Sequence, residues 1–296
     1  MNTLLYSILG VTTFVGYYLY RIAPNNAYNK NFKPFEDFYI AHRGLFNNNS
    51  NAPENSLEAF RLAVSHNYGI ELDIQITTDK RLVVFHDETL ERMCCVNKKV
   101  TECNYNELKQ YKLKTTNERI PLLDEVLEVI AGKVPLVIEI KSTEKLIETT
   151  RMLAERMDSY DGIYCVESFH PLAIEWYRKN RPNIIRGQLS DNFFRTNEKL
   201  NFFEKLILSN LLMNNHSRPD FIAYNFKNKN QISYMICRSL FKTKNFAWTV
   251  RSQSELNFVK KSFDVIIFDS FIPKQSETSF KICQNSLPSK IGKEGL

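Results

Sequence analysis

From residue 38 onward, short runs of β-branched and apolar residues alternate with longer segments whose apolar positions recur every three or four residues. The short runs predict eight strands, at residues 38–41, 70–76, 135–140, 163–166, 184–188, 221–224, 245–249 and 265–268. The longer segments predict helices, among them 56–67, 122–131, 143–157, 171–179 and 252–261. Eight strand–helix units with short connections favour an α/β fold, a closed (β/α)₈ TIM barrel, over an open doubly wound sheet.

Residues 82–118 depart from this alternation. The segment begins with the apolar run 82–85 and continues through a polar, lysine-rich and cysteine-containing stretch. It is typical of an insertion on the second strand–helix unit, and we place the insertion at about 87–118. The barrel domain then spans 38–270. The asparagine-rich segment 22–37, with Pro24 and Pro34, is interpreted as a tether, and 271–296 as a C-terminal tail.

Residues 3–20 carry no charge and consist mostly of apolar and aromatic residues. This length predicts a single transmembrane helix at 1–21, although a cleaved signal peptide or a buried core helix remains open. The first basic residues, Arg21, Lys30 and Lys33, all follow the segment. The positive-inside rule therefore predicts a membrane anchor with the catalytic region on the cytoplasmic side.

Composition excludes several classes of function. The chain is 43% hydrophobic and 24% charged, with a formal charge of +6 that is spread along the sequence. The absence of a Lys/Arg run argues against nucleic acid as a partner, and no protein partner is evident. There is no GxGxxG or P-loop motif for a dinucleotide or nucleotide triphosphate. The six cysteines form no CxxC pair, and we interpret them as free thiols.

Strand alternation places several charged residues on one face. Residues two apart in a strand point to the same side, so Glu71 shares a face with Asp73, and Glu139 with Lys141. Three carboxylates from two strands suit a hard divalent cation, Mg²⁺ or Ca²⁺. The alternative is a purely structural ion network with Arg43 or Lys141.

Two histidines follow strands that end near the same rim. His42 follows the first strand, and His86 follows the run at 83–85. Because histidine exchanges protons near neutral pH, the pair beside a carboxylate cluster predicts acid–base catalysis. His66, His170 and His216 lack such neighbours.

A set of motifs in this order resembles the glycerophosphodiester phosphodiesterase family over about residues 38–270. The motifs are His42-Arg43-Gly44, Pro53-Glu54-Asn55-Ser56, Glu71-Leu72-Asp73, Thr78-Asp79, His86-Asp87, Ile120-Pro121-Leu122, Ile138-Glu139-Ile140-Lys141 and Trp248-Thr249-Val250.

The resemblance implies a TIM barrel with a small insertion after its second strand. It further implies metal-dependent hydrolysis of a glycerophosphodiester to glycerol 3-phosphate and an alcohol. The implied roles are His42 and His86 as the acid–base pair, Glu71, Asp73 and Glu139 as metal ligands, Arg43 and Lys141 as phosphate-binding residues, Glu54 as support for the loop beside His42, and Trp248 as a wall of the glycerol pocket. For Trp248, plain barrel packing is the alternative.

Three departures from the family pattern stand out. They are an asparagine-rich loop at 45–52, the sequence Met93-Cys94-Cys95 after the second histidine, and a final strand whose sequence leaves its contact with the site in doubt.

The membrane helix adds a second candidate substrate, a lysophospholipid cleaved in a lysophospholipase D reaction. A catalytically silent barrel that binds a phosphorylated ligand or a membrane partner, and a phosphoinositide-specific phospholipase C-like barrel, are further alternatives.

Overall fold

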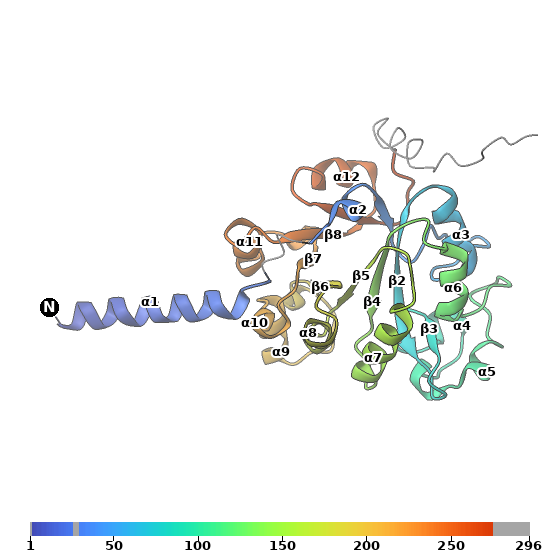
Figure 1. Ribbon diagram of the computed structural model, residues 1–296, viewed down its shortest axis with the longest axis horizontal. Coiled ribbons are helices and arrows are strands. Elements are labelled where there is room, and N and C mark those ends of the chain that lie inside the picture. The colour runs from blue at the N-terminus through green and yellow to red at the C-terminus, as the bar shows by residue number, and fades with distance from the viewer. Residues whose placement is uncertain (1, 26–29, 275–296) are drawn as a thin grey trace, which may run out of the picture.

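The computed structural model describes residues 2–25 and 30–274, and its centre is a closed barrel of eight parallel strands (Figure 1). The barrel strands are β1 (Tyr39–Ala41), β2 (Gly69–Ile76), β4 (Leu136–Ile140), β5 (Tyr164–Ser168), β6 (Ile185–Ser190), β7 (Phe221–Asn225), β8 (Lys244–Val250) and β9 (Val265–Phe268). Each pairs with the next in this order, and β1 closes the barrel by pairing with both β2 and β9. The predicted TIM barrel is confirmed, and a further short strand, β3 (Leu82–Val84), pairs antiparallel with the end of β2.

Helices surround the barrel. They are α1 (Asn2–Ile22), α2 (Lys33–Glu36), α3 (Leu57–Ser65), α4 (Glu91–Cys94), α5 (Tyr105–Leu108), α6 (Leu123–Ile130), α7 (Leu146–Met157), α8 (Pro171–Asn180), α9 (Phe202–Ser209), α10 (Asn214–Ser217), α11 (Ile232–Ser239) and α12 (Gln253–Val259), with 3₁₀ turns η1 (Val100–Glu102), η2 (Phe193–Arg195) and η3 (Phe226–Asn228). All five helices named from the sequence are present. The pattern did not single out α9, α10 and α11, which are only four to eight residues long.

Both faces of the barrel wall are buried, as expected for a parallel sheet. All eight residues of β2 are buried. Leu72 and Ile74 pack in the layer between the strands and the helices. The alternate positions on β2 carry Glu71, Asp73 and Gln75 into the barrel, which sets the polar site among otherwise apolar strands.

The segment expected to be a tether contributes to the core. Phe32 and Phe35, at the start of α2, are buried and pack against Phe246, and Phe32 also packs against Phe221. Burying two phenyl rings provides several kcal/mol, roughly 1.5–3 kcal/mol each. The described part of this segment therefore closes the N-terminal end of the barrel.

The insertion after β2 is a small folded unit. Residues from β3 to the segment before α6 form their own apolar cluster, which includes Phe85, Met93, Val100 and Leu113. This cluster fixes the position of the loop that carries His86.

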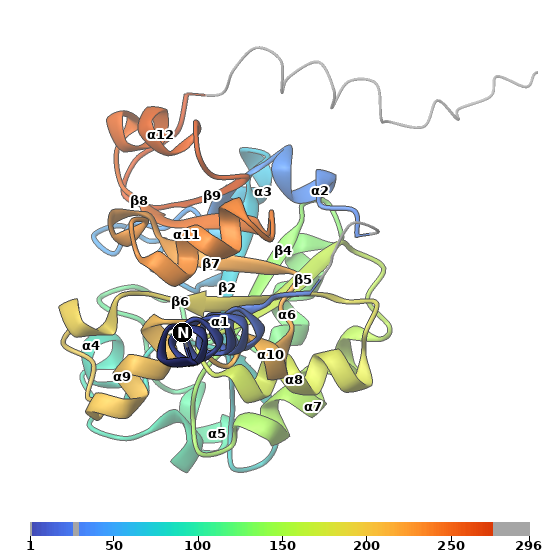
Figure 2. The ribbon, with the colours of Figure 1, turned by 90° about the vertical axis from the view of Figure 1, so that its left-hand side faces the viewer.

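The N-terminal helix α1 extends away from the barrel (Figures 1 and 2). Residues 3–22 are long and apolar enough to cross a membrane, and side chains 3–17 are exposed. The alternative of a buried core helix is therefore wrong for this segment. Ile22, at the end of α1, is fully buried against the barrel helices.

Candidate active site and metal centre

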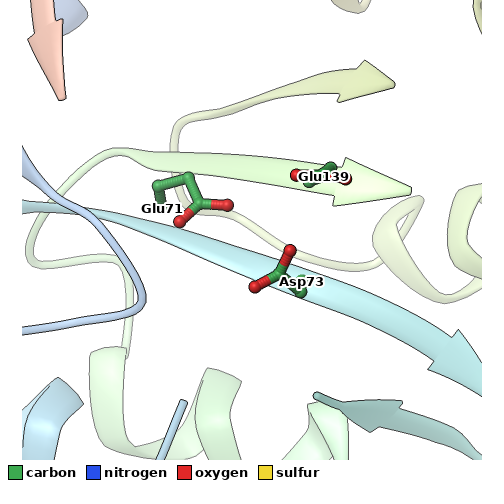
Figure 3. A group of neighbouring side chains, drawn as sticks. All are labelled: Glu71, Asp73 and Glu139. Atoms are coloured by element: carbon green, nitrogen blue, oxygen red, sulfur yellow. The ribbon is translucent and has the colours of Figure 1, made fainter. Parts of the chain in front are cut away.

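Three carboxylates from two neighbouring strands meet inside the barrel (Figure 3). Glu71 and Asp73 lie on β2, and Glu139 lies on β4, where the register pairs it with Asp73. All three side chains are buried, and one oxygen from each lies within 4.8 Å of the others. The structure thus brings together the three groups that strand parity predicted to converge.

Two cations balance part of this negative charge. Lys141 Nζ lies 2.7 Å from Glu139 Oε1 and 3.2 Å from Asp73 Oδ1, and Arg43 Nε lies 3.5 Å from Asp73 Oδ2. Burial raises the pKa of Asp73, but Lys141, His86 and Arg43 outweigh burial and hold that pKa well below its usual range. Asp73 is therefore ionised at neutral pH.

The cluster still carries more negative charge than these two cations balance. Burial, with repulsion from Asp73 and Glu139, raises the pKa of Glu71 well above its usual value. Burial and the same two carboxylates also raise the pKa of Glu167, which lies beside Glu139 in the register of β5 and β4. A buried charge without a partner is costly. Several oxygen donors with surplus negative charge fit a hard divalent cation, which Glu71, Asp73 and Glu139 could hold.

His42 is held at the end of β1 by the last strand of the barrel. Its backbone N–H donates to Phe268 at 2.9 Å, and its Nδ1 lies 3.0 Å from Asp269 Oδ2. Arg251 Nε donates in turn to Asp269 Oδ1. Burial and the neighbouring Arg43 lower the pKa of His42 to about 4, although Asp269 opposes them. The imidazole is therefore neutral at pH 7, and Nε2 lies 3.9 Å from Glu71 Oε2.

His86 is paired with a carboxylate in the same way. Its Nδ1 lies 2.6 Å from Asp87 Oδ1, and Arg92 donates to both oxygens of Asp87. Gln75 on β2 donates from Nε2 to the carbonyls of Phe85 and Asp87. The loop that carries His86 is therefore tied directly to the strand that carries two of the carboxylates.

Glu54 links the two histidine loops. It accepts hydrogen bonds from Arg43 at 2.6 Å and from both terminal nitrogens of Arg92 at 2.7 Å. Burial raises the pKa of Glu54, but Arg92 and Arg43 outweigh it and lower the pKa to about 2. Asn48, in the asparagine-rich loop, also donates to Glu54. That loop therefore contributes to the network around the site.

The turn after β1 requires glycine. Gly44 has φ +81°, and a Cβ there would lie 2.9 Å from the carbonyl carbon of Ala59. Arg43 before it also has positive φ, and its backbone N–H donates to Glu71 Oε2 at 2.9 Å. This close packing against α3 points the Arg43 side chain back toward the carboxylates.

A cavity of about 700 Å³ opens beside these groups. His86, Glu139, Lys141 and Trp248 line one part of it. The Trp248 ring packs edge-to-face on Phe169, with ring centroids 5.6 Å apart. The remaining walls are largely apolar and come from the segments after β5 and β6: Leu172, Phe193, Leu200, Ile207, Leu208 and Met213.

Two site residues escaped the sequence prediction. Glu167 was missed because the fourth predicted strand, at 163–166, ended one residue before it, whereas the corresponding strand β5 continues through Ser168. Asp269 was assigned no role, and the doubt about a contact from the last strand was wrong because Asp269 binds His42. The position of Asp269 directly after a parallel barrel strand could have identified it as a candidate site residue.

Comparisons with known proteins agree with this geometry. Residues 42–270 match the glycerophosphoryl diester phosphodiesterase family. The chain is 29% identical over 227 residues to "Putative glycerophosphodiester phosphodiesterase YhdW" of Bacillus subtilis, covering 73% of this chain and 87% of that protein. It is 36% identical over 122 residues to lysophospholipase D GDPD1 of Rattus norvegicus, covering 37% of this chain and 38% of that protein. The structure of an Oleispira antarctica phosphodiesterase with the product sn-glycerol-3-phosphate has the same fold, with a TM-score of 0.65 and 22% identity over 82% of this chain and 96% of that chain.

Replacing Glu71 should separate charge repulsion from metal binding. Because the folded protein raises the pKa of Glu71, its ionised form destabilises the fold at pH 8, and Glu71→Gln should raise the Tm in chelator. Mg²⁺ or Ca²⁺ at about 100 times its Kd should stabilise the wild type by about 2.7 kcal/mol, but not the variant. Thermal unfolding followed by circular dichroism measures both effects. Glu128→Gln, an exposed change on α6, is the matched control. An equal metal response in Glu71→Gln and wild type would contradict this assignment.

Proposed function

The chain belongs to the glycerophosphoryl diester phosphodiesterase family and is a phosphodiesterase, and on that premise we propose that it hydrolyses glycerophosphodiesters to sn-glycerol 3-phosphate and an alcohol. One observation carries the proposal. Two imidazoles, each held by a carboxylate, lie at the rim of a barrel whose interior holds a surplus of buried carboxylates. This arrangement suits an anionic substrate that needs both charge neutralisation and proton transfer.

Glu71, Asp73 and Glu139 hold one divalent cation, Mg²⁺ or Ca²⁺. When bound, the cation polarises the phosphodiester and offsets the charge of its oxygens. The basic side chains of Arg43 and Lys141 bind the phosphate. Their ion pairs with Asp73 hold them at the site. Glu54 orients Arg43 through the 2.6 Å hydrogen bond between them.

The two histidines divide the proton transfers. His42, neutral at pH 7 with its pKa lowered to about 4, accepts at Nε2 the proton of the glycerol hydroxyl that attacks phosphorus, while Asp269 holds Nδ1; after the alcohol leaves, water opens the resulting cyclic phosphate to glycerol 3-phosphate. His86, whose Nδ1 is bound by Asp87, donates a proton from Nε2 to the leaving alcohol oxygen. The glycerol portion lies against Trp248, whose buried indole N–H has no hydrogen-bond acceptor among the described residues.

A second candidate function is a lysophospholipase D reaction at a membrane. The supporting observation is the apolar part of the cavity, because glycerol, phosphate and a small head group do not need such walls. A volume of about 700 Å³ lies in the usual range for small-molecule sites. Helix α1 would anchor the barrel in the bilayer, and Arg21, Lys30 and Lys33 after it favour the cytoplasmic side.

Replacing either histidine should abolish most turnover. His42→Gln and His86→Gln should each lower kcat on glycerophosphocholine by about 10²–10⁴-fold, the usual contribution of a general acid or base. The control is His216→Gln, an exposed change on α10 outside the cavity lining. An enzyme-coupled assay that detects the released glycerol 3-phosphate measures the rates. Turnover in neither wild type nor variants, across several glycerophosphodiesters, would instead favour a silent binding barrel.

The two ends of β9 provide a matched test of Asp269. Asp269→Asn should lower kcat about 10- to 100-fold with little change in KM, because the amide cannot hold the Nδ1–H of His42 as a carboxylate does. Asp264→Asn, at the opposite end of the same strand and bound to Lys244 and Asn245, should leave kcat unchanged. Equal effects of the two changes on kcat would contradict a positioning role for Asp269.

A charge in the apolar wall should separate the two candidate substrates. Ile207→Asp should lower kcat/KM for lysophosphatidylcholine at least about tenfold, because an acyl chain would then lie against an ionised group. The same variant should retain kcat/KM for glycerophosphocholine. Ile147→Asp, on the exposed face of α7, is the control. Unchanged selectivity in Ile207→Asp would exclude the acyl chain from this wall.

A further inference from the structure

The membrane-length helix is attached to the barrel by specific contacts at its last turn. The Tyr18 hydroxyl lies 2.7 Å from Ser233 Oγ on α11, and Arg21 Nε donates to the Leu212 carbonyl at 2.8 Å. The buried Ile22 ends the helix. These contacts fix the direction of α1, so they also determine which face of the barrel lies next to a bilayer that α1 would cross.

That face carries a cluster of exposed aromatic side chains. Phe194 on η2 and Phe202 and Phe203 at the start of α9 are 48%, 63% and 72% exposed. Their rings pack in sequence, with centroids 5.8 Å apart in both pairs. Leu206, one turn along α9, is also exposed. A contiguous aromatic patch in water is unfavourable and indicates an interaction surface. We call these four residues the α9 patch.

The cavity extends from the candidate active site to a residue that contacts the base of α1. Met213 lines the cavity, and its Sδ lies 3.9 Å from Arg21 Nη2. Ile207 and Leu208, on the same helix as the α9 patch, line the cavity from inside. Seen along α1, helices α9, α10 and α11 lie around its end (Figure 2). His86, Glu139 and Lys141 therefore line one part of the cavity, and Met213, which contacts the last turn of α1, lines another.

We propose that the α9 patch inserts into the bilayer interface beside α1 and admits a single-chain phospholipid from the membrane into the apolar part of the cavity. The occupant of the patch is the lipid bilayer, because the contacts of Tyr18 and Arg21 attach a helix of membrane-spanning length to α11 and to the segment that directly follows α9. Phenylalanine and leucine on one side of a short helix suit insertion to the depth of the acyl boundary. This inference rests on the proposed phosphodiesterase function and its membrane anchor, and it assigns the route by which lipid substrate arrives.

Tryptophan scanning of the full-length chain in proteoliposomes tests insertion. Phe203→Trp should gain a blue-shifted emission above that of wild type, and about half of this added emission should be lost when the vesicles contain phosphatidylcholine brominated on its acyl chains. Ile147→Trp, a matched change at an exposed isoleucine on α7, should stay unquenched. An unquenched indole at position 203 would indicate a water-facing or protein-binding patch and overturn the proposal. Equal quenching at both positions would also overturn it.

Turnover of two substrates tests the entry route. The double change Phe202→Ser and Phe203→Ser should lower turnover of lysophosphatidylcholine in vesicles about a hundredfold, as expected when two phenyl rings no longer enter the bilayer, and leave turnover of water-soluble glycerophosphocholine unchanged. Unchanged turnover of both substrates, or an equal loss on both, would contradict the entry route. No turnover of either substrate by wild type, with the expected quenching at position 203, would refute the phosphodiesterase function and leave the inserted surface standing.

Discussion

The site depends on an imbalance of buried charge. β2, β4 and β5 bring four carboxylates into the barrel, where Arg43 and Lys141 form ion pairs with Asp73, and Lys141 also pairs with Glu139. Asp73 remains ionised because both Lys141 and Arg43 lie beside it. The pKa of Glu71 is raised because burial and repulsion from Asp73 and Glu139 outweigh the attraction of Arg43. Such an arrangement costs folding free energy, and a divalent cation among the carboxylates would recover it while preparing the site for an anionic substrate. The same charges thus connect the stability of the barrel to its chemistry.

Two loops place His42 and His86 beside this cluster of carboxylates. The loop after β1 is held by Gly44 against α3, and the loop after β3 is held by Gln75 and by the apolar core of the insertion. Each loop presents one histidine, and each histidine is bound by a carboxylate at Nδ1. Glu54 joins the loops through Arg43 and Arg92. The strands therefore supply the buried charges, and loops that are hydrogen-bonded to those strands supply the two histidines.

Much of this could be predicted from the sequence because it depends on local periodicity. Alternation within single strands predicted that Glu71 shares a face with Asp73 and Glu139 with Lys141, and the order of elements predicted the barrel that brings the two strands together. The missed features depend on contacts between distant segments. Asp269 reaches His42 only because β9 pairs with β1, and Phe35 joins the core only because α2 covers the N-terminal end of the barrel. Strand alternation alone would have placed Glu167 on the inner face, but the predicted strand ended at residue 166, two residues before the end of β5.

We propose that the surplus carboxylates hold one divalent cation. Locating that ion by crystallography tests this proposal directly. Crystals grown with Mn²⁺, a substitute for Mg²⁺ or Ca²⁺ with strong anomalous scattering, would locate the ion without reference to activity. We expect a single anomalous peak about 2.0–2.6 Å from one oxygen each of Glu71, Asp73 and Glu139. A cluster without a peak at saturating Mn²⁺, with Lys141 still bridging Asp73 and Glu139, would contradict it and leave a purely structural ion network.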